Sequence, residues 1–538
     1  PMKYIELFAG CGGLSVGLES LKYEMVFANE LSPMASETFA YNLLKEDLRH
    51  LADNKKSASK VKWISSQYAS NELASRLREN PQNYPKFTSA TSELGDHLDD
   101  LYGKLIVGSI VELNRYLTSN KNVVVALQDQ NIDLVSGGPP CQSFSLAGLR
   151  QHDNNRNTLP MDFAELVGLV KPKIALLENV SGILRAFSLP NGKHYAWFEV
   201  AKAFASKGYY PLCLHVNAKF AGAAQNRPRF IMLALREDVF KSFKRNIRKE
   251  TLLSKLGKIE SFFDSERNGE TTAPFEHLDY YDIEKHTDLF ETDTLSPLYQ
   301  YKDVNSWFSV KDAIDDLRDE SSKSTKTAYP KYLDKTFRSL AKTIVPHDSS
   351  ENSAPRLNSP KVRMRFKLYQ HLSHAPLYKG GKAIQRDVVN FLKDPSTHVL
   401  AENSIDYLMQ KKFLLLDGES LIQFGDNKSL LEYLGSLATK KQTQRALIPN
   451  KPAPAALSIP DDACHYHPSL QRTLTVREMA RFQSFPDKFE FRSKVTTGGK
   501  MRRFEVPQYT QVGNAVPPLL GRALGKTVQN ILEISNKM

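Results

Sequence analysis

Cys141 stands in a loop whose composition suits a catalytic thiol. The loop, GGPPCQSFS at 137–145, follows an apolar segment at 132–136 that predicts a strand. Two glycines and two prolines predict a rigid loop that presents a side chain at a sheet edge, where catalytic groups are common. A cysteine thiolate is a strong nucleophile. A lone cysteine is more often a small core residue, but its position directly after two prolines favours a catalytic role.

Charged side chains lie at the ends of two further apolar segments, after one and before the other. Glu178 follows the predicted strand at 173–177, and a carboxyl kept protonated there could donate a hydrogen bond to a ring nitrogen. Arg227 and Arg229 precede a predicted strand at 230–235 and lie on the same side of it. They could hold a carboxylate, a phosphate or a carbonyl oxygen. The alternatives are a solvated acid near a helix start and two solvated strand-end arginines.

A glycine-rich turn at the start of the chain suits a bound nucleoside. The segment FAGCGG at 8–13 joins a predicted strand at 3–8 to a predicted helix at 14–21, and glycines there let a ligand approach the backbone. Glu30 follows the next strand, where an acid can accept hydrogen bonds from ribose hydroxyls. The spacing is not GxGxxG, so a dinucleotide site is a poor match. An ordinary tight turn and a surface acid are the alternative.

The elements that must position these residues alternate between strand and helix over the first 236 residues, which predicts an α/β domain with a mostly parallel sheet. A polar stretch at 50–100 interrupts the alternation and has few strand signals, so we expect an insertion. Residues 237–470 are irregular. Regular patterns return in a predicted helix at 475–482, where Thr475 and Glu478 have capping-box spacing, and in one at 515–532.

Composition favours a polyanionic partner. The 538 residues include 72 Lys and Arg against 60 Asp and Glu, a net charge of +12, with a pI near 9.2. A hydrophobic content of 41% excludes wholesale disorder. Four cysteines in 538 residues are too few for a disulfide scaffold. They form no CxxC pair, so we expect no metal site. No apolar run could span a bilayer, so we expect no membrane partner and a reducing, cytoplasmic location.

Alternation of charge at 361–368 predicts a DNA-contacting strand. In KVRMRFKL every second residue is cationic. A strand would therefore place four cations on one face and four apolar residues on the other. We expect the cationic face to contact phosphates; a charged edge strand that prevents aggregation is the alternative. The four cations are Lys361, Arg363, Arg365 and Lys367.

Taken together, the motifs resemble the DNA (cytosine-5)-methyltransferase family. The turn at 8–13 is similar to that family's motif for S-adenosyl-L-methionine (AdoMet), PCQ at 140–142 to its nucleophile loop and ENV at 178–180 to its ENV motif. QNRPR at 225–229 matches QxRxR, RTLTVRE at 472–478 matches RxLTxRE, and GNAV at 513–516 matches the closing motif. Six motifs in the family's order make the resemblance specific. It covers about the first 236 and the last 67 residues.

The resemblance implies a two-part architecture. We expect a Rossmann-like, class I AdoMet-dependent methyltransferase domain, a smaller and irregular α+β target recognition domain, and a DNA cleft between them. The expected bounds are 1–308 for the catalytic domain, 309–508 for the recognition domain and 509–538 for a segment that returns to the catalytic domain. The first range includes the insertion, at about 46–104, and a possible accessory segment at 240–308.

The resemblance also assigns binding residues. Ser109 stands where the family usually has an Asp that accepts from the adenine amino group, and a serine would accept more weakly. Gln142, Ser145 and Arg156 are expected to contact DNA. The cofactor residues expected are Phe8, Ala9, Gly10, Cys11, Gly12, Gly13, Glu30, Leu31, Ser109, Ile110, Pro140, Leu159, Asn514 and Ala515.

The mechanism implied is covalent. Cys141 would attack C6 of a flipped-out cytosine, protonated Glu178 would contact N3, and Arg229 would contact O2. Arg227 would hold Glu178 or a phosphate. AdoMet would give up its methyl group to C5 and leave as S-adenosyl-L-homocysteine, with no metal.

The expected partner is double-stranded DNA, in a bacterial restriction–modification system or an orphan relative. The enzyme would act as a monomer, bound to the nucleoid through DNA, and a cognate endonuclease could share its site without forming a complex. An RNA cytosine methyltransferase is disfavoured by the long region at 237–470. A silent DNA-binding homologue is disfavoured by the intact Cys141, Glu178, Arg227 and Arg229, and a nicotinamide oxidoreductase by the missing GxGxxG.

Overall fold

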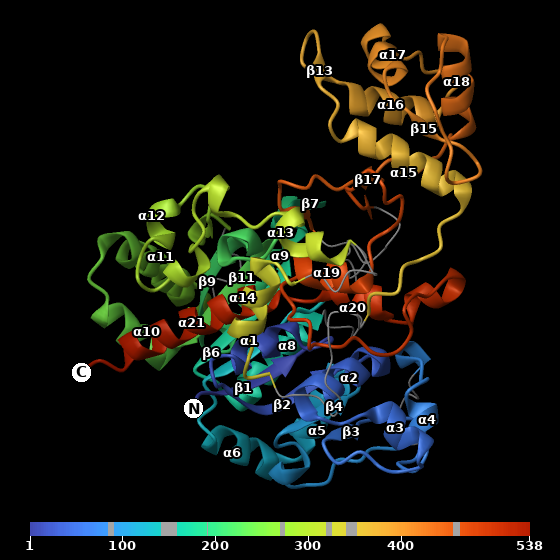
Figure 1. Ribbon diagram of the computed structural model, residues 1–538. Helices are drawn as coiled ribbons and strands as arrows, with labels where there is room; N and C mark the ends of the chain where they lie inside the picture. Colours follow the sequence, from blue (N-terminus) through green and yellow to red (C-terminus); the bar gives the residue numbers. More distant parts are fainter. Residues whose placement is uncertain are drawn as a thin grey trace.

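The computed structural model describes residues 1–83, 91–140, 159–190, 192–268, 275–318, 325–340, 352–455 and 463–538. Most of these residues form a large α/β body, and residues 360–446 form a lobe that stands apart from it, at the upper right of Figure 1. Among the described helices, none is both long enough and apolar enough to pass through a bilayer.

A nine-stranded sheet runs through the body in the order β12-β9-β11-β6-β5-β1-β2-β4-β3. Neighbouring strands are parallel except around β11, which is antiparallel to both β6 and β9. This large mixed sheet confirms the predicted α/β fold. The strands are β1 (Lys3–Leu7), β2 (Glu24–Glu30), β3 (Val61–Trp63), β4 (Lys104–Val107), β5 (Leu134–Gly137), β6 (Ile174–Val180), β9 (Tyr209–Asn217), β11 (Pro228–Arg236) and β12 (Tyr280–Asp282).

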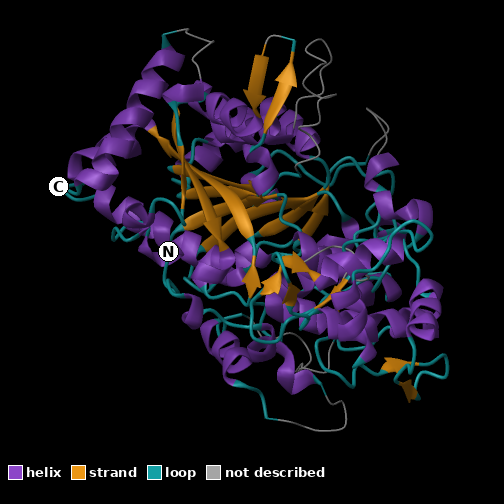
Figure 2. Cartoon of the chain, turned by 90° about the horizontal axis from the view of Figure 1, so that it is seen from above, coloured by secondary structure: helices purple, strands orange, loops and turns teal. Residues whose placement is uncertain are grey.

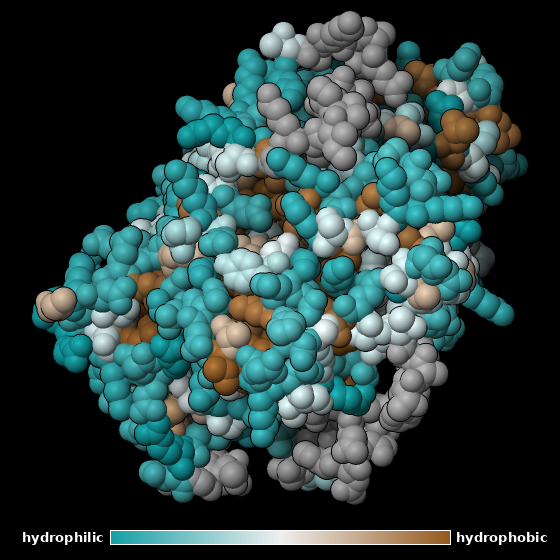
Figure 3. Space-filling view, turned by 90° about the horizontal axis from the view of Figure 1, so that it is seen from below, coloured by the Kyte–Doolittle hydropathy of each residue, from teal (hydrophilic) through white to brown (hydrophobic). Residues whose placement is uncertain are grey.

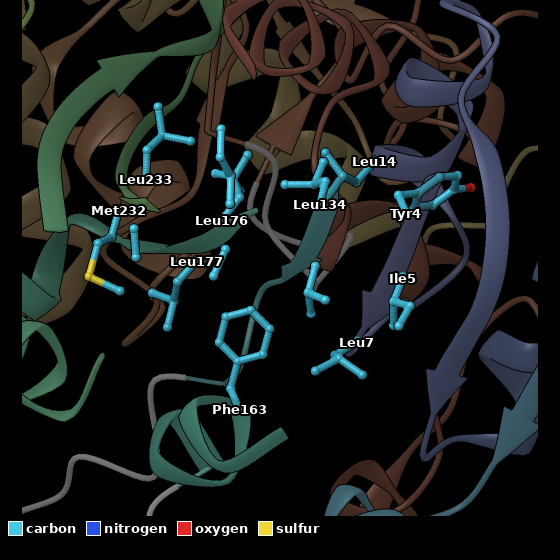
Figure 4. Packing of buried hydrophobic residues seen from close by; sticks show 14 of the residues in the cluster. Tyr4, Ile5, Leu7, Leu14, Leu134, Phe163, Leu176, Leu177, Met232 and Leu233 are labelled. Carbon is cyan, nitrogen blue, oxygen red and sulfur yellow. The ribbon is translucent and has the colours of Figure 1, made fainter. Parts of the chain in front are cut away.

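Helices cover both faces of the sheet (Figure 2). In the core, Leu14 of α1 (Gly13–Glu19) packs on one side of the strands, and Phe163 of α8 (Leu159–Val170) packs on the other, near Leu7 and Leu177 (Figure 4). Burial on both faces explains why the central strands are continuously apolar. Other covering helices are α5 (Ile110–Ser119), α6 (Lys121–Asp129), α9 (Ala196–Ser206), α10 (Glu237–Asn246) and α21 (Pro518–Ser535).

The segment expected as an insertion contributes to the sheet. It contains α3 (Leu48–Asp53), β3 and α4 (Leu73–Arg76), and β3 pairs in parallel with β4 at the sheet edge. Trp63 of β3 is buried beneath the guanidinium of Arg76, which lies 5.1 Å from the ring centroid. The expectation of few strands missed β3 because three residues are too short for a periodic signal.

Residues 240–308 likewise pack on the main core. Helix α11 (Glu250–Arg267) contacts α9 and β9, and β12 extends the sheet beside β9. Tyr210 of β9 stacks between Phe240 and Phe263, with ring centroids 4.1 and 3.8 Å away. Stacked aromatic rings join this segment to the body.

The lobe has a core of its own. Its buried residues run from Met364 to Ala446, with Cys464 in addition, and form a cluster separate from those of the body. By contrast, residues 310–340 and 447–512 share a cluster with Cys11 and Val16 of the body. The lobe's helices are α15 (Pro360–Leu372), α16 (Ile384–Lys393), α17 (Glu402–Met409) and α18 (Asn427–Ser436).

The strand predicted at 361–368 is wrong, because these residues form α15. Ser359 caps the helix by accepting from the Val362 N–H, and Pro360 occupies its first position, where proline is favoured. In a helix, alternate residues point in different directions, so the expected single cationic face of Lys361, Arg363, Arg365 and Lys367 does not form. Three of these cations donate to backbone carbonyls of the lobe or its junction: Arg363 to Gly418, Arg365 to Leu437 and Ala438, and Lys367 to Pro468.

Two predicted helices are confirmed near the C-terminus. Helix α19 (Val476–Phe482) begins with the capping box of Thr475 and Glu478, and α21 begins at Pro518. Apolar residues are largely used in the three cores, and the face in Figure 3 is mostly hydrophilic with only separate hydrophobic spots.

Candidate active site

The segments that carry the predicted site meet at one edge of the sheet. Strands β1, β2, β4, β5 and β6 are parallel, so their carboxyl ends lie at the same edge. Leu7, Gly137 and Leu177 are paired across β1, β5 and β6. The strand order reverses at β1, and open α/β sheets bind ligands outside the strand ends at such a point.

The glycine-rich turn follows β1 at this edge. Phe8, Gly10 and Gly12 have left-handed φ angles of 52°, 56° and 103°, a conformation in which glycine has no steric penalty. The Gly10 N–H donates to Oε1 of Glu30 over 2.8 Å, and the Ser32 N–H donates to Oε2 over 2.6 Å. The carboxylate therefore joins the turns after β1 and β2, and burial raises its pKa.

These residues fit a nucleoside cofactor. A β-carbon on Gly10 would meet no atom within 4 Å, so there is open space directly above the turn. Each carboxylate oxygen of Glu30 can accept a second hydrogen bond, which suits a ribose diol. Ser109 caps α5 by accepting from the Val111 N–H over 3.1 Å. The hydroxyl keeps one further lone pair and its proton for other hydrogen bonds.

The GNAV segment closes against the glycine turn. It was predicted to open the C-terminal helix, but Gly513 and Asn514 end α20 (Gln508–Asn514), and Ala515 and Val516 lie in the turn before α21. A β-carbon on Gly13 would lie 2.2 Å from the carbonyl oxygen of Val516. A β-carbon on Gly17 would lie 2.4 Å from the backbone nitrogen of Arg522. Helices α1 and α21 thus approach so closely that only glycine fits between them.

Cys141, Gln142, Ser145 and Arg156 lie outside the described residues, which reach Pro140 on this loop. Gly138 and Pro139, which are described, contact the end of β6. The Asn179 side chain donates to the Pro139 carbonyl over 3.2 Å, and a β-carbon on Gly138 would lie 2.6 Å from Oε2 of Glu178. The loop therefore leaves β5 packed against the end of β6.

Glu178 forms an ion pair at this sheet edge. It lies within β6, which continues to Val180, rather than after the strand as predicted. Nε of Arg229 is 3.1 Å from Oε1 of Glu178, and each side chain is 12% exposed. Arg229 thus makes the contact with Glu178 that the sequence interpretation gave to Arg227.

Arg227 is directed to the closing turn. Its guanidinium donates to the carbonyls of Gly513 and Ala515 over 2.8 and 3.2 Å. Its backbone N–H donates to Asn217 over 2.9 Å. Burial, reinforced by the nearby charge of Arg229, lowers the pKa of Arg227 to about 9. The geometry makes Arg227 a support for the turn after α20.

A chain of two hydrogen bonds beside the site joins three residues that the sequence analysis did not identify. Oγ of Ser181, the first residue after β6, is 2.7 Å from Nε2 of His215. Nδ1 of His215 is 2.7 Å from Oδ2 of Asp282. These residues lie on β6's end, β9 and β12, which are far apart in sequence, so no motif joins them. These hydrogen bonds hold Ser181, three residues past Glu178, against β9.

Comparisons with known proteins identify the family of this chain. A family model, C-5 cytosine-specific DNA methylase, matches residues 2–65 and 114–530. Type II methyltransferase M.DdeI of Desulfomicrobium norvegicum is 24% identical, over 99% of this chain and 90% of its own. Type II methyltransferase M.XorII of Xanthomonas oryzae pv. oryzae is 24% identical, over 98% and 84%. Type II methyltransferase M.AgeI of Thalassovita gelatinovora is 27% identical, over 74% and 83%.

The matched ranges include the glycine turn, Glu30, Glu178, Arg229 and the closing turn, and leave out Ser109 and Ile110. The family uses AdoMet and methylates C5 of cytosine in DNA. Because the match extends over most of the chain, the protein belongs to the C-5 cytosine-specific DNA methylase family.

Proposed function

We propose that this enzyme methylates cytosine through a covalent bond from Cys141 to a base flipped out of double-stranded DNA. C5 of cytosine is a poor nucleophile, and thiolate attack forms an S–C6 bond that moves the ring electrons toward C5. AdoMet supplies the electrophilic methyl group for C5 and leaves as S-adenosyl-L-homocysteine. Loss of the C5 proton to a base then restores the C5–C6 double bond and expels Cys141.

The pairing of Glu178 with Arg229 is the observation that carries this proposal. N3 and O2 of cytosine are joined through one ring carbon, so a carboxyl and a guanidinium held 3.1 Å apart can contact both at once. In its acid form Glu178 donates to N3, while Arg229 turns from Glu178 to O2. Both contacts stabilise the negative charge that develops as Cys141 adds to C6.

The cofactor would be held by the turns after β1, β2, β4 and β5. Glu30 accepts from the ribose hydroxyls, the glycines admit the ligand to the backbone, and Ser109 contacts the adenine. The full set proposed is Phe8, Ala9, Gly10, Cys11, Gly12, Gly13, Glu30, Leu31, Ser109, Ile110, Pro140, Leu159, Asn514 and Ala515. Cys11 itself is buried near the backbone of Gln511, so it contributes through its backbone.

DNA would be bound between the catalytic edge and the lobe. We propose that Gln142, Ser145 and Arg156 contact the DNA near the flipped base, where unpairing costs a few kcal/mol. The lobe, with its independent core, reads the target sequence. The enzyme acts as a monomer and protects a site that a cognate endonuclease would cut, as expected for a relative of type II methyltransferases.

Trapping on DNA that contains 5-fluorocytosine tests the proposal. Fluorine at C5 blocks the final elimination, so the wild-type enzyme with AdoMet should form an adduct that survives denaturation. Cys141→Ser should form none, while Cys213→Ser, a change at a buried cysteine of β9, should form it normally. An adduct with Cys141→Ser, or none with wild type that still binds AdoMet, would contradict the covalent route.

A further inference from the structure

Gln483, which no sequence motif above singled out, is completely buried just after α19. Its Nε2 donates to the carbonyl oxygens of Val512 and Ala515 over 2.7 and 3.2 Å. These carbonyls belong to the end of α20 and the turn after it. The Val512 carbonyl also accepts from the Ala515 N–H over 3.2 Å. Gln483 therefore adds a second donor at the end of α20, where carbonyls lack their usual helical partners, and joins it to the segment after α19.

Gln483 belongs to a buried polar network with Gln225 and Arg227. Nε2 of Gln225 donates to Oε1 of Gln483 over 2.7 Å, and Oε1 of Gln225 accepts from Arg227 over 3.2 Å. All three side chains are at most 2% exposed. Arg227 satisfies the carbonyl of Gly513 and shares that of Ala515 with Gln483. Such a network is rigid when satisfied and costly to break.

The network binds the turn at 515–517, which is closely packed on both sides. On one side, Val516 packs against Gly13: a β-carbon on Gly13 would lie 2.2 Å from the Val516 carbonyl oxygen. On the other side, the Leu519 N–H donates to the hydroxyl of Ser484 over 3.0 Å. Gln483 and Ser484 are adjacent, so the same short segment after α19 holds both ends of the turn.

We propose that Gln483 is a positioning residue for cofactor binding. By holding Val512 and Ala515 it sets the position of Asn514 and Ala515 opposite the glycine turn, and with it the width of the cofactor pocket. This inference rests on the proposed placement of AdoMet against Asn514 and Ala515. Gln483 touches no reacting atom, so its loss acts on cofactor affinity and leaves the chemical step nearly unchanged.

Cofactor binding by Gln483→Ala tests the inference. Calorimetry with S-adenosyl-L-homocysteine should show a Kd about tenfold higher than wild type, the size expected from losing buried hydrogen bonds. The KM for AdoMet should rise by the same factor, while kcat at saturating AdoMet stays within about twofold. The Kd for DNA should not change.

Two further variants separate positioning from general destabilisation. Gln483→Met keeps the length of the side chain, has no donor for Val512 or Ala515 and brings no charge into the buried position. It should therefore lose affinity as Gln483→Ala does, and it tests the inference if the alanine variant fails to fold. Tyr509→Phe removes a buried hydrogen bond from α20 to the Leu474 carbonyl, 2.6 Å long and away from the turn. It should bind cofactor normally.

The outcomes distinguish this inference from the proposed function. Wild-type affinity in Gln483→Met, or an equal loss in Tyr509→Phe, would overturn the positioning role of Gln483 but would leave the proposed cofactor site unaffected. Failure of the wild-type protein to bind S-adenosyl-L-homocysteine would overturn the proposed cofactor site and the inference with it.

Discussion

Gly138 and Glu178 are packed so closely that a β-carbon on residue 138 would stand 2.6 Å from Oε2 of Glu178. A side chain at 138 must therefore displace the carboxyl from its place beside Arg229. We expect Gly138→Ala to lower kcat at least about tenfold, because the contact with N3 is made as charge develops. Cofactor affinity, measured by calorimetry, should remain near wild type.

Gly182→Ala is the matched control for that change. Gly182 lies four residues past Glu178, and a β-carbon there would have an ordinary 3.8 Å contact with Val180. It should retain nearly full kcat. If Gly138→Ala also retained full kcat, catalysis would not depend on the present position of the Glu178 carboxyl.

Glu30→Gln should weaken binding of S-adenosyl-L-homocysteine about tenfold. Both carboxylate oxygens of Glu30 accept backbone N–H groups, from Gly10 and Ser32. The amide nitrogen of a glutamine must face one of these donors, which disturbs the turn and removes an acceptor for the ribose. Glu46→Gln is the control, because Glu46 also accepts backbone N–H groups, from Ser59 and Lys60, but in the insertion. Equal affinities in the two variants would argue against the ribose assignment.

Arg365→Ala should destabilise the lobe by about 1–2 kcal/mol. Its guanidinium donates to the carbonyls of Leu437 and Ala438, which follow α18, and the loss leaves these acceptors without that donor. Lys361→Ala, at an exposed position of the same helix, should leave stability nearly unchanged. Urea unfolding measures both. Similar losses would mean that α15 is not anchored through Arg365.

His465 should make stability depend on pH. Burial lowers its pKa to about 4, against about 6.5 in an unfolded chain. Between pH 6.5 and 4 the unfolded chain therefore binds more protons, so the stabilising contribution of neutral His465 is complete above pH 6.5 and decreases as the pH falls. From pH 7 to pH 5 wild type should lose roughly 2 kcal/mol more unfolding free energy than His465→Asn.

Asparagine is the informative replacement because it preserves an acceptor near Nδ1, which accepts from the His467 N–H over 2.9 Å. Replacing His97, which is 79% exposed, should leave the wild-type pH dependence intact. Urea titrations at the two pH values give the comparison, and an unchanged slope in His465→Asn would assign the acid sensitivity to other groups.

Sequence motifs that depend only on neighbouring residues predicted helix starts well. The capping box of Thr475 and Glu478 fixed the start of α19 correctly, because it depends only on residues three apart. The same kind of signal, Ser359 before Pro360, also marks the start of α15. The alternating charges at 361–368 outweighed it in the interpretation, although Met364, Leu368 and Leu372, spaced four apart, are the buried residues that a helix requires.

Contacts between distant segments could not be predicted in the same way. The motifs correctly brought Glu178 and the two arginines to one sheet edge, but which arginine pairs with Glu178 depends on how β11 pairs with β6, where Arg229 lies opposite Val180. Asp282 and His215 are 67 residues apart, and Gln483 is 258 residues from Gln225. Only the folded sheet and the closing turn bring these side chains together.

The close fit of α21 against α1 has a consequence for synthesis of the protein. Gly13 and Gly17 in the first helix are in contact with the backbone of residues 516–522, which leave the ribosome some five hundred residues later. Domains that need such distant contacts cannot finish folding until both segments are available. A nascent chain therefore carries an incompletely packed glycine turn, and we expect cofactor binding to begin only after residues 516–522 have been synthesised.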